Sequence, residues 1–333
     1  MKRVFILFAV FYISIIVISQ DKYKVGMIGL DTSHSPKFVE AINDPRAKPL
    51  YQEFKVVVAY PYGSKTIKNS IERIPEYIEE VKKHGVKIVS SIEELLNEVD
   101  FVLLETNDGN LHLEQANEVF KAGKVTFIDK PIGANLAQAI AVFELARKYN
   151  VPVFSSSVLR FATMNQNLAK GKSGEILGVD CYSPAPTEPT HPDFSWYGIH
   201  GVETLFTIMG TGCIEVNRMS GKDNDIVVGL WEDGRIGSFR ARQTGRFIYG
   251  GNAFTPKGAF PVGKSEGYEL LLDEILMFFK SKVVPVSEKE TLEIFTFMEA
   301  SNESKKNNGS IISMEKTFKR GQKEAKKLLK KLK

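Results

Sequence analysis

The sequence predicts an α/β protein: a Rossmann-type, doubly wound parallel sheet, followed by an α+β domain with an open, largely antiparallel sheet. From Tyr23 to Ser156, short apolar runs alternate with amphipathic stretches, which is typical of βαβ units. Between residues 175 and 251, consecutive β-rich runs are joined by short turns, which favours antiparallel pairing. The length of 333 residues allows two domains of ordinary size. We therefore expect domains at 21–156 and 157–333.

The elements of the first domain follow one another as apolar strands and amphipathic helices. Two helix boundaries are marked: Ser91 and Glu94 form a capping box, and Gly123 ends a helix. Strands are expected at 24–30, 54–60, 86–90, 100–106, 124–131 and 151–157, and helices at 34–43, 71–85, 91–99, 110–123 and 135–150.

The second domain is expected to contain a run of consecutive strands, two of which are joined as a hairpin by the turn at Glu232–Gly234. Strands are expected at 175–183, 214–220, 225–234, 235–243 and 246–251, and helices at 267–282 and 289–309. The lysine-rich tail at 315–333 is predicted to be a helix with an apolar stripe of Phe318, Leu328, Leu329 and Leu332. We interpret it as a solvated terminal helix; weak contact with an anionic membrane surface is the alternative.

Composition narrows the functional classes. The formal net charge of +4 is small for 333 residues and gives no support to nucleic-acid binding. Cys181 and Cys213 are the only cysteines, and they form neither a disulfide framework nor a zinc motif, so we interpret both as structural.

The N-terminus has the pattern of an export signal. Lys2 and Arg3 precede an uncharged run from Val4 to Gln20, which has the basic-then-apolar order of a secretory signal and is slightly short for a membrane span. We expect residues 1–20 to be a signal peptide and the mature protein to be periplasmic or extracellular. The alternative is an uncleaved membrane anchor.

The stretch "KVGMIGLDTSHSPKFVEAIN" has the strand–turn–helix order of a dinucleotide fingerprint. Gly29 occupies the first glycine position, but Asp31 and His34 occupy the second and third. A carboxylate at the second position disfavours a diphosphate and favours capping of the following helix. Hydroxyl donors at a helix N-terminus still make a usable anion site, and three are present: Thr32, Ser33 and Ser35.

Asp129-Lys130-Pro131 ends a predicted strand and resembles the Glu-Lys-Pro motif of the glucose–fructose oxidoreductase, inositol dehydrogenase and MocA-like (Gfo/Idh/MocA) family. Other pieces follow in the family's order: "NLHLEQANEVFKAGK", Arg160-Phe161, "WYGIHGVE" and "FMEASNESKKNNG". The resemblance covers nearly all of the mature chain. It implies a domain that binds NAD or NADP, hydride transfer at a carbinol carbon of a sugar or cyclitol, and a homo-oligomer.

The resemblance also implies a catalytic pair, Lys130 and His200. A lysine ammonium stabilises a developing alkoxide, and an imidazole accepts a hydroxyl proton near neutral pH. The substrate-binding residues are expected to be Arg160, Trp196, Tyr197 and Glu203. Trp196 stands where the family often has an aspartate; its ring and that of Tyr197 suit stacking on a sugar, with a place in the core as the alternative. Glu203 is expected either to orient His200 or to face solvent.

The cofactor contacts are expected to include the end of the second strand. Tyr60 stands where an acidic residue would bind the ribose 2′-hydroxyl of NAD, whereas Ser64 and Lys65 suit a 2′-phosphate, so NADP is slightly preferred. An ordinary exposed loop is the alternative. The expected set is Gly29, Asp31, Thr32, Ser33, Ser35, Tyr60, Ser64, Lys65, Thr106 and Asp129.

Two alternatives to an exported NAD(P)-dependent oxidoreductase stay open. One is a non-redox carbohydrate lyase or hydrolase that uses Lys130, His200 and Glu105; the other is a non-catalytic carbohydrate-binding protein of the cell envelope. A tightly bound, recycling cofactor would reconcile export with redox chemistry. Asp31, His34, Glu105 and His112 could together form a metal site. We prefer to interpret them as polar groups that line a wet cleft, and therefore assign no metal ligands.

Overall fold

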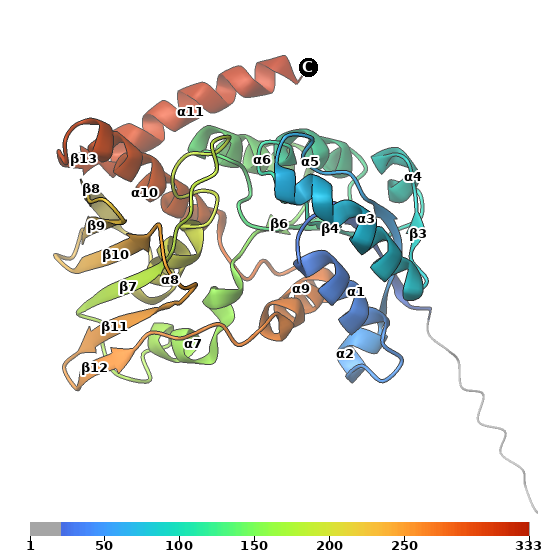
Figure 1. The fold of residues 1–333 in the computed structure, drawn as a ribbon, viewed down its shortest axis with the longest axis horizontal. Coiled ribbons are helices and arrows are strands. Elements are labelled where there is room, and N and C mark those ends of the chain that lie inside the picture. The colour runs from blue at the N-terminus through green and yellow to red at the C-terminus, as the bar shows by residue number, and fades with distance from the viewer. Residues whose placement is uncertain (1–20, 333) are drawn as a thin grey trace, which may run out of the picture.

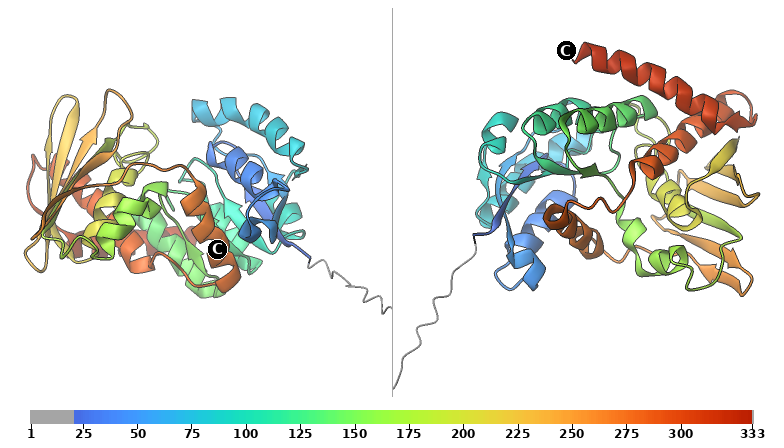
Figure 2. Two further views of the ribbon diagram at one scale, coloured as in Figure 1. Left: turned by 90° about the horizontal axis from the view of Figure 1, so that it is seen from below. Right: turned by 180° about the vertical axis from the view of Figure 1, so that it is seen from behind.

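Two sheets, each covered by helices, lie side by side in the computed structural model, which describes residues 21–332 (Figure 1). The predicted signal peptide or anchor at 1–20 lies outside the described residues. The views from below and from behind show the same separation into two halves (Figure 2). Among the described residues, no helix is both long and apolar enough to cross a membrane.

The first sheet is parallel throughout and has the strand order β3-β2-β1-β4-β5-β6, which confirms the predicted doubly wound sheet. The order reverses between β1 and β4, and the carboxyl edge at such a reversal is where ligands bind in open α/β sheets. Its strands are β1 (Tyr23–Ile28), β2 (Phe54–Tyr60), β3 (Lys87–Ile88), β4 (Phe101–Leu104), β5 (Val125–Ile128) and β6 (Val153–Phe154).

The helices of the first domain begin and end close to their sequence signals. Ser91 accepts a hydrogen bond of 3.1 Å from the Glu94 N–H, as the capping box predicts. Asn135 caps the next long helix, and Asn150 ends it in the left-handed conformation. The helices are α1 (His34–Asn43), α2 (Pro49–Gln52), α3 (Lys68–Lys83), α4 (Ile92–Leu96), α5 (His112–Lys121) and α6 (Leu136–Tyr149).

The second sheet has the order β12-β11-β7-β10-β9-β8-β13 and is antiparallel except where β7 pairs with β10. The run at 246–251, predicted as a strand, is mostly a loop that precedes an unpredicted hairpin. The strands are β7 (Gly178–Pro184), β8 (Cys213–Ser220), β9 (Asn224–Trp231), β10 (Ile236–Arg242), β11 (Gly250–Thr255), β12 (Gly258–Pro261) and β13 (Ile312–Ser313). The helices are η1 (Val158–Phe161), α7 (Thr163–Ala169), α8 (Ile199–Met209) and α10 (Glu288–Lys306).

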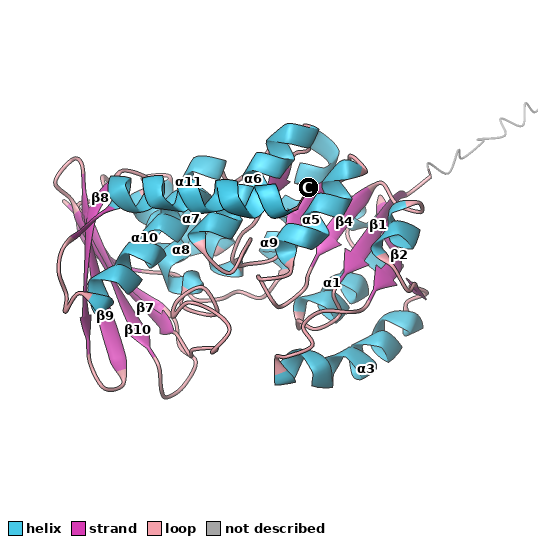
Figure 3. Ribbon diagram, turned by 90° about the horizontal axis from the view of Figure 1, so that it is seen from above, coloured by secondary structure: helices cyan, strands magenta, loops and turns pink. Residues whose placement is uncertain are grey.

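Two helices late in the chain return to the first domain. In α9 (Glu269–Ser281), Phe279 stacks on Phe101 of β4 with ring centroids 4.8 Å apart. The last helix, α11 (Met314–Lys331), lies along α6 (Figure 3). The predicted apolar stripe of this tail is partly buried against the main core and is therefore used for packing.

Candidate active site

A cavity of about 580 Å³ lies between the two domains. One wall is the carboxyl edge of the parallel sheet, and the other is built from loops and α8 of the second domain. Its lining includes Thr32, Ser33, His34, Asn69, Arg73, Asn107, Asp129 and Lys130 from the first domain, and Glu188, Trp196, Tyr197, His200, Phe247 and Tyr249 from the second. The volume and position suit a small polar ligand.

Lys130 follows β5 and projects into this cavity from the sheet edge. It is half-buried, and its ammonium nitrogen lies 5.8 Å from the centroid of the Tyr197 ring. No hydrogen bond joins this ammonium to another group among residues 21–332. Three N–H donors are therefore available to an oxygen-rich ligand.

His200 lies in the first turn of α8 and is 6% exposed. Its Nδ1 is 2.7 Å from the Ser157 hydroxyl, which leaves Nε2 as the ring nitrogen available to a ligand. Burial and the nearby Lys130 charge hold the pKa of His200 well below its usual value. The ring is therefore neutral near pH 7 and able to accept a proton.

Arg160 and Glu203 do not line the cavity, although both were predicted to bind substrate. The Arg160 Nε donates to Glu203 at 2.7 Å, and its Nη1 donates to Glu290 at 2.6 Å. Glu203 also accepts hydrogen bonds from the Ser156 hydroxyl and the Ser157 N–H. The pair therefore joins η1 to α8 and α10, and Glu203 acts on His200 only through Ser157.

Aromatic side chains form much of the second-domain wall. Trp196 and Tyr197 are half-buried and line the cavity, so neither is a core residue. The Tyr197 hydroxyl is 2.7 Å from that of Tyr249, and the Tyr197 ring packs edge-on against Phe247. Sequence reasoning missed Tyr249 and Phe247 because their segment was assigned to a strand.

Asp31 does not cap α1, contrary to the prediction. Ser33 occupies the N-cap position without a side-chain hydrogen bond, while the Asp31 carboxylate accepts from the Asn107 N–H at 2.9 Å. Burial raises the pKa of Asp31 to about 6. The carboxylate thus points into the junction of the β1–α1, β2–α3 and β4–α5 loops. It does not accept hydrogen bonds from the first backbone N–H groups of α1, which therefore remain available to a ligand.

Three buried ionisable side chains meet at the floor of the cavity. His34 Nδ1 lies 3.1 Å from Asp129 Oδ1 and 3.6 Å from Glu105 Oε2. Burial alone would lower the pKa of His34, but the two carboxylates raise it to about 10, and burial raises the pKa of Glu105 to about 7. Of the possible metal set considered from sequence, Asp31 and His112 are not part of this cluster.

His112 has a structural position. Its Nδ1 lies 2.8 Å from the Pro131 carbonyl oxygen and its Nε2 lies 2.7 Å from that of Thr106. Both ring nitrogens are thus engaged with the backbone. The ring ties the loop after β4 to the loop after β5, which carries Lys130.

The first domain resembles a known protein family. The family model GFO_IDH_MocA, described as an oxidoreductase family with an NAD-binding Rossmann fold, matches residues 23–157 of this chain. The first domain, residues 23–157, is thus similar to the Gfo/Idh/MocA oxidoreductase family. It is also 31% identical over 138 residues to the uncharacterized oxidoreductase YhhX of Escherichia coli (strain K12). That match covers 38% of this chain and 40% of the relative, so it leaves the rest of both proteins unmatched.

Solved structures of similar fold cover both domains. A scyllo-inositol dehydrogenase from Lactobacillus casei, with bound NAD(H) and scyllo-inositol, is 16% identical with a TM-score of 0.70, over 89% of this chain and 100% of that chain. An oxidoreductase from Agrobacterium radiobacter, in complex with NAD⁺, L-tartaric acid and magnesium, is 13% identical with a TM-score of 0.69, over 89% and 99%. At these identities the likeness establishes the shared two-domain fold.

The nicotinamide nucleotide that the Gfo/Idh/MocA family implies fits this cleft at its diphosphate region. Gly29 has a φ of +90°, and a Cβ there would lie 2.5 Å from the Thr106 nitrogen, so this first fingerprint position requires glycine. Thr32 and Ser33 line the cavity beside the uncapped start of α1. An uncapped helix N-terminus suits a diphosphate.

The adenosine region fits less well. A Cβ at Gly63 would lie 2.0 Å from Asp31 Oδ2, so the β2–α3 loop rests directly on the Asp31 carboxylate. The Ser64 hydroxyl is buried and accepts the Ile67 N–H at 3.2 Å, which corrects the expectation that it meets a 2′-phosphate. Ser35 is likewise turned inward, donating to the Gly29 carbonyl oxygen at 2.9 Å.

Three of the remaining predicted cofactor residues are spread around the cleft. Tyr60 is half-buried, Lys65 is exposed, and Thr106 is fully buried beside Gly29; none of these three lines the cavity. Of the ten predicted residues, Thr32, Ser33 and Asp129 do. A bound nucleotide would therefore contact fewer of the predicted groups than the family resemblance implies.

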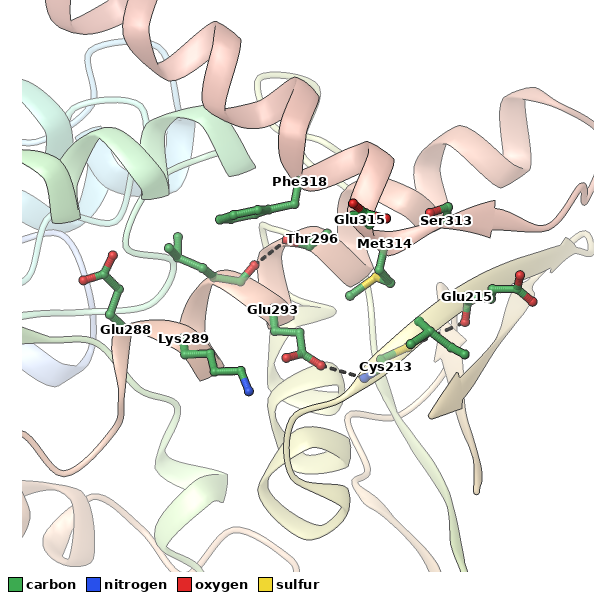
Figure 4. A pocket seen from close by; sticks show the side chains of 12 residues that line it. Cys213, Glu215, Glu288, Lys289, Glu293, Thr296, Ser313, Met314, Glu315 and Phe318 are labelled. Carbon is green, nitrogen blue, oxygen red and sulfur yellow. Dashed lines mark hydrogen bonds between the residues drawn. The ribbon is translucent and has the colours of Figure 1, made fainter. Parts of the chain in front are cut away.

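A second cavity, of about 820 Å³, lies between β8, α10 and the start of α11 (Figure 4). The Glu293 carboxylate accepts the N–H groups of Gly212 and Cys213 at 2.6 and 2.7 Å beside it. Cys213 and Cys181 are both buried and free, as predicted, and burial raises the pKa of each thiol. None of the predicted site residues lines this second cavity.

Proposed function

We propose that the chain is an exported enzyme that oxidises or reduces a carbinol carbon of a sugar, cyclitol or glycoside with NAD or NADP. The observation that carries this proposal is that Lys130 and His200, from different domains, face one cavity beside the open N-terminus of α1. The similarity of the first domain to an NAD-binding oxidoreductase family supports the cofactor, and the similar fold of an inositol dehydrogenase supports the substrate class.

The residues of the chain have distinct tasks in this reaction. The Lys130 ammonium donates to the carbinol oxygen and stabilises alkoxide character as it develops. The neutral His200 ring accepts the hydroxyl proton at Nε2, and Ser157 fixes its orientation through Nδ1. Trp196, Tyr197 and Tyr249 cover the apolar face of the ring. A bound nicotinamide supplies the hydride acceptor.

The nucleotide preference rests on fewer residues than the sequence predicted. Lys65 is exposed near the end of β2 and is available to a 2′-phosphate, whereas Ser64 is not. We retain NADP as slightly preferred on the strength of Lys65 alone. Because free nucleotide is scarce outside the cytoplasm, a tightly bound cofactor that is oxidised and reduced within one cycle would suit an exported enzyme.

Export and self-association belong to the same proposal. The basic-then-apolar N-terminus supports export, which fractionation of the native host tests directly. Exposed apolar side chains on the second sheet, Met219, Ile236 and Phe254, support packing against a second copy. Light scattering of the purified protein tests for a homo-oligomer.

A second candidate is a non-redox carbohydrate lyase or hydrolase. It is favoured by the Asp31 carboxylate, which fills the junction where the adenosine half of a nucleotide would enter. In this reaction Lys130 and His200 act as acid and base without hydride transfer. Nucleotide binding distinguishes the two candidates, because only the first requires it.

The experiment is a screen of sugars and cyclitols in which nicotinamide absorbance and product masses are both recorded. Lys130→Met is compared with Lys121→Met, a control at an exposed lysine of α5. The proposal predicts substrate-dependent nicotinamide reduction or oxidation that Lys130→Met lowers by about 100-fold or more and Lys121→Met leaves unchanged. Product formation without any nucleotide would favour the second candidate. Ligand binding without turnover, unaffected by Lys130→Met, would overturn both.

A further inference from the structure

The three buried side chains at the floor of the active-site cavity come from three neighbouring strands of the parallel sheet. His34 follows β1, Glu105 follows β4 and Asp129 follows β5. One ligand-type atom of each lies within 4.8 Å of the others, and all three side chains are buried. The cluster therefore sits where the sheet order reverses, at the edge that binds ligands in such folds.

The polar atoms of this cluster lack hydrogen-bond partners. Both carboxylate oxygens of Glu105, Oδ1 of Asp129 and Nδ1 of His34 are buried and accept or donate no hydrogen bond within the described chain. Buried carboxylates in folded proteins are normally satisfied by N–H or O–H donors, and leaving one unpaired is costly. His34 and Asp129 are close enough to bond, yet their atoms are not aligned as a hydrogen bond.

The distances between the ligand-type atoms of His34, Glu105 and Asp129 match those between atoms bound to one metal ion. Zinc and similar ions hold imidazole nitrogen and carboxylate oxygen at about 2.0–2.2 Å, so neighbouring ligands lie roughly 3.0–3.5 Å apart. The observed separations from His34 Nδ1 are 3.1 Å to Asp129 and 3.6 Å to Glu105. Two carboxylates and a neutral imidazole also balance the charge of one divalent cation. A ligand set with an imidazole favours Zn²⁺, Mn²⁺ or Fe²⁺ over Mg²⁺.

We propose that His34, Glu105 and Asp129 form a binding site for one divalent transition-metal ion. His34 and Asp129 both line the cavity, so the open coordination positions would face a ligand held by Lys130. The ion would bind a substrate hydroxyl or carbonyl oxygen as a Lewis acid and help Lys130 to stabilise negative charge on it. This inference does not rest on the proposed function, because it suits both the redox and the non-redox candidate.

The test measures metal binding by the untagged, full-length mature protein. After chelator treatment, Zn²⁺, Mn²⁺ and Co²⁺ are each titrated by calorimetry, and the visible spectrum of the Co²⁺ form is recorded. Glu105→Gln removes one ligand at nearly constant shape, and Glu188→Gln is the matched control on the opposite wall. We expect one equivalent of metal per chain, affinity lowered about 100-fold or more by Glu105→Gln, and no change with Glu188→Gln.

Two results would overturn the proposal. One is that the wild-type protein binds none of the three ions, in which case His34 is a protonated partner of the two carboxylates. The other is that Glu105→Gln binds them as tightly as wild type, which would locate the metal elsewhere. If Glu105→Gln does not fold, Asp129→Asn replaces it. Nucleotide titration of the same samples is a separate measurement, so failure of the metal site and failure of the proposed function are distinguishable.

Discussion

The Ser157 hydroxyl lies 2.7 Å from His200 Nδ1, while the Ser157 N–H donates to Glu203 at 2.8 Å. Ser157 thus connects the imidazole on α8 to the buried Arg160–Glu203 pair. Glu203, one helical turn after His200, makes its hydrogen bonds with Ser156, Ser157 and Arg160. The hydroxyl that meets the His200 ring comes instead from Ser157, in the loop after β6. The orientation of the proposed proton acceptor is therefore set by a contact between two segments that are far apart in the sequence.

Replacing Ser157 by Ala should lower the free energy of unfolding by about 1–3 kcal/mol, because it leaves His200 Nδ1 buried without a partner. Ser157→Thr keeps the hydroxyl and should restore most of the loss. Urea unfolding measures both variants. Equal stability of Ser157→Ala and wild type would show that the hydrogen bond does not hold the ring.

Replacing Arg160 by Met should cost about 3–5 kcal/mol of stability, because it leaves the buried Glu203 carboxylate without its guanidinium. The double variant Arg160→Met/Glu203→Leu should recover part of that loss, since the fully buried carboxylate is gone and only the partly exposed Glu290 is left without the guanidinium. Denaturant unfolding of the two proteins makes the comparison. If Arg160→Met is as stable as wild type but no longer binds sugar, Arg160 would instead be a substrate-binding residue.

Asp31 should make stability depend on pH. Its pKa is about 6 in the folded state against 3.8 ordinarily, so the folded state holds this proton more tightly than the unfolded chain does. The stability contributed by this group is therefore present in acid and is lost as the pH rises through about 6. Compared with wild type, the free energy of unfolding of Asp31→Asn should become more favourable to the folded state by about 2–3 kcal/mol when the pH is raised from about 4 to about 7. Thermal unfolding at both pH values checks this, and a pH-independent difference would contradict it.

Gly201 sets the distance between α8 and β10. A Cβ there would lie 2.2 Å from Cε2 of the Phe239 ring and 2.7 Å from the Ser183 hydroxyl oxygen. Gly201→Ala should therefore destabilise the protein by about 1–3 kcal/mol, although alanine is the better helix former. Adding Phe239→Leu should relieve part of the strain, and unfolding of the single and double variants measures the coupling. Stabilisation by the single variant would mean that α8 can move away from the sheet.

Much of the fold could be predicted because its signals are local. The buried apolar strands, the Ser91 capping box and the bounds of α1 and β2 follow from runs and spacings that the sequence displays directly. The hairpin after residue 249 was missed because its glycine-rich strands carry little apolar alternation. The return of α9 to the first sheet depends on tertiary packing, which no local pattern records.

The candidate site was predictable only in part. Lys130 and His200 follow from motifs, and both reach the cavity. The direction of the Asp31 side chain depends on three loops meeting, and the Arg160–Glu203 pair depends on how η1 docks on α8, so neither could be inferred from spacing. His34 and Glu105 were considered from sequence only within a possible metal set that also held Asp31 and His112. Their neighbour in the structure, Asp129, lies in a motif that had been assigned to the cofactor.

The most direct test of the proposed function is nucleotide binding by protein purified from its native export route. The protein is denatured, released NAD(H) or NADP(H) is sought by absorbance and mass spectrometry, and both nucleotides are titrated into the emptied protein by calorimetry. We expect a nicotinamide nucleotide, either released in stoichiometric amount or bound on titration at the open N-terminus of α1. The absence of both released nucleotide and heat with either cofactor would contradict this expectation and leave the non-redox candidate.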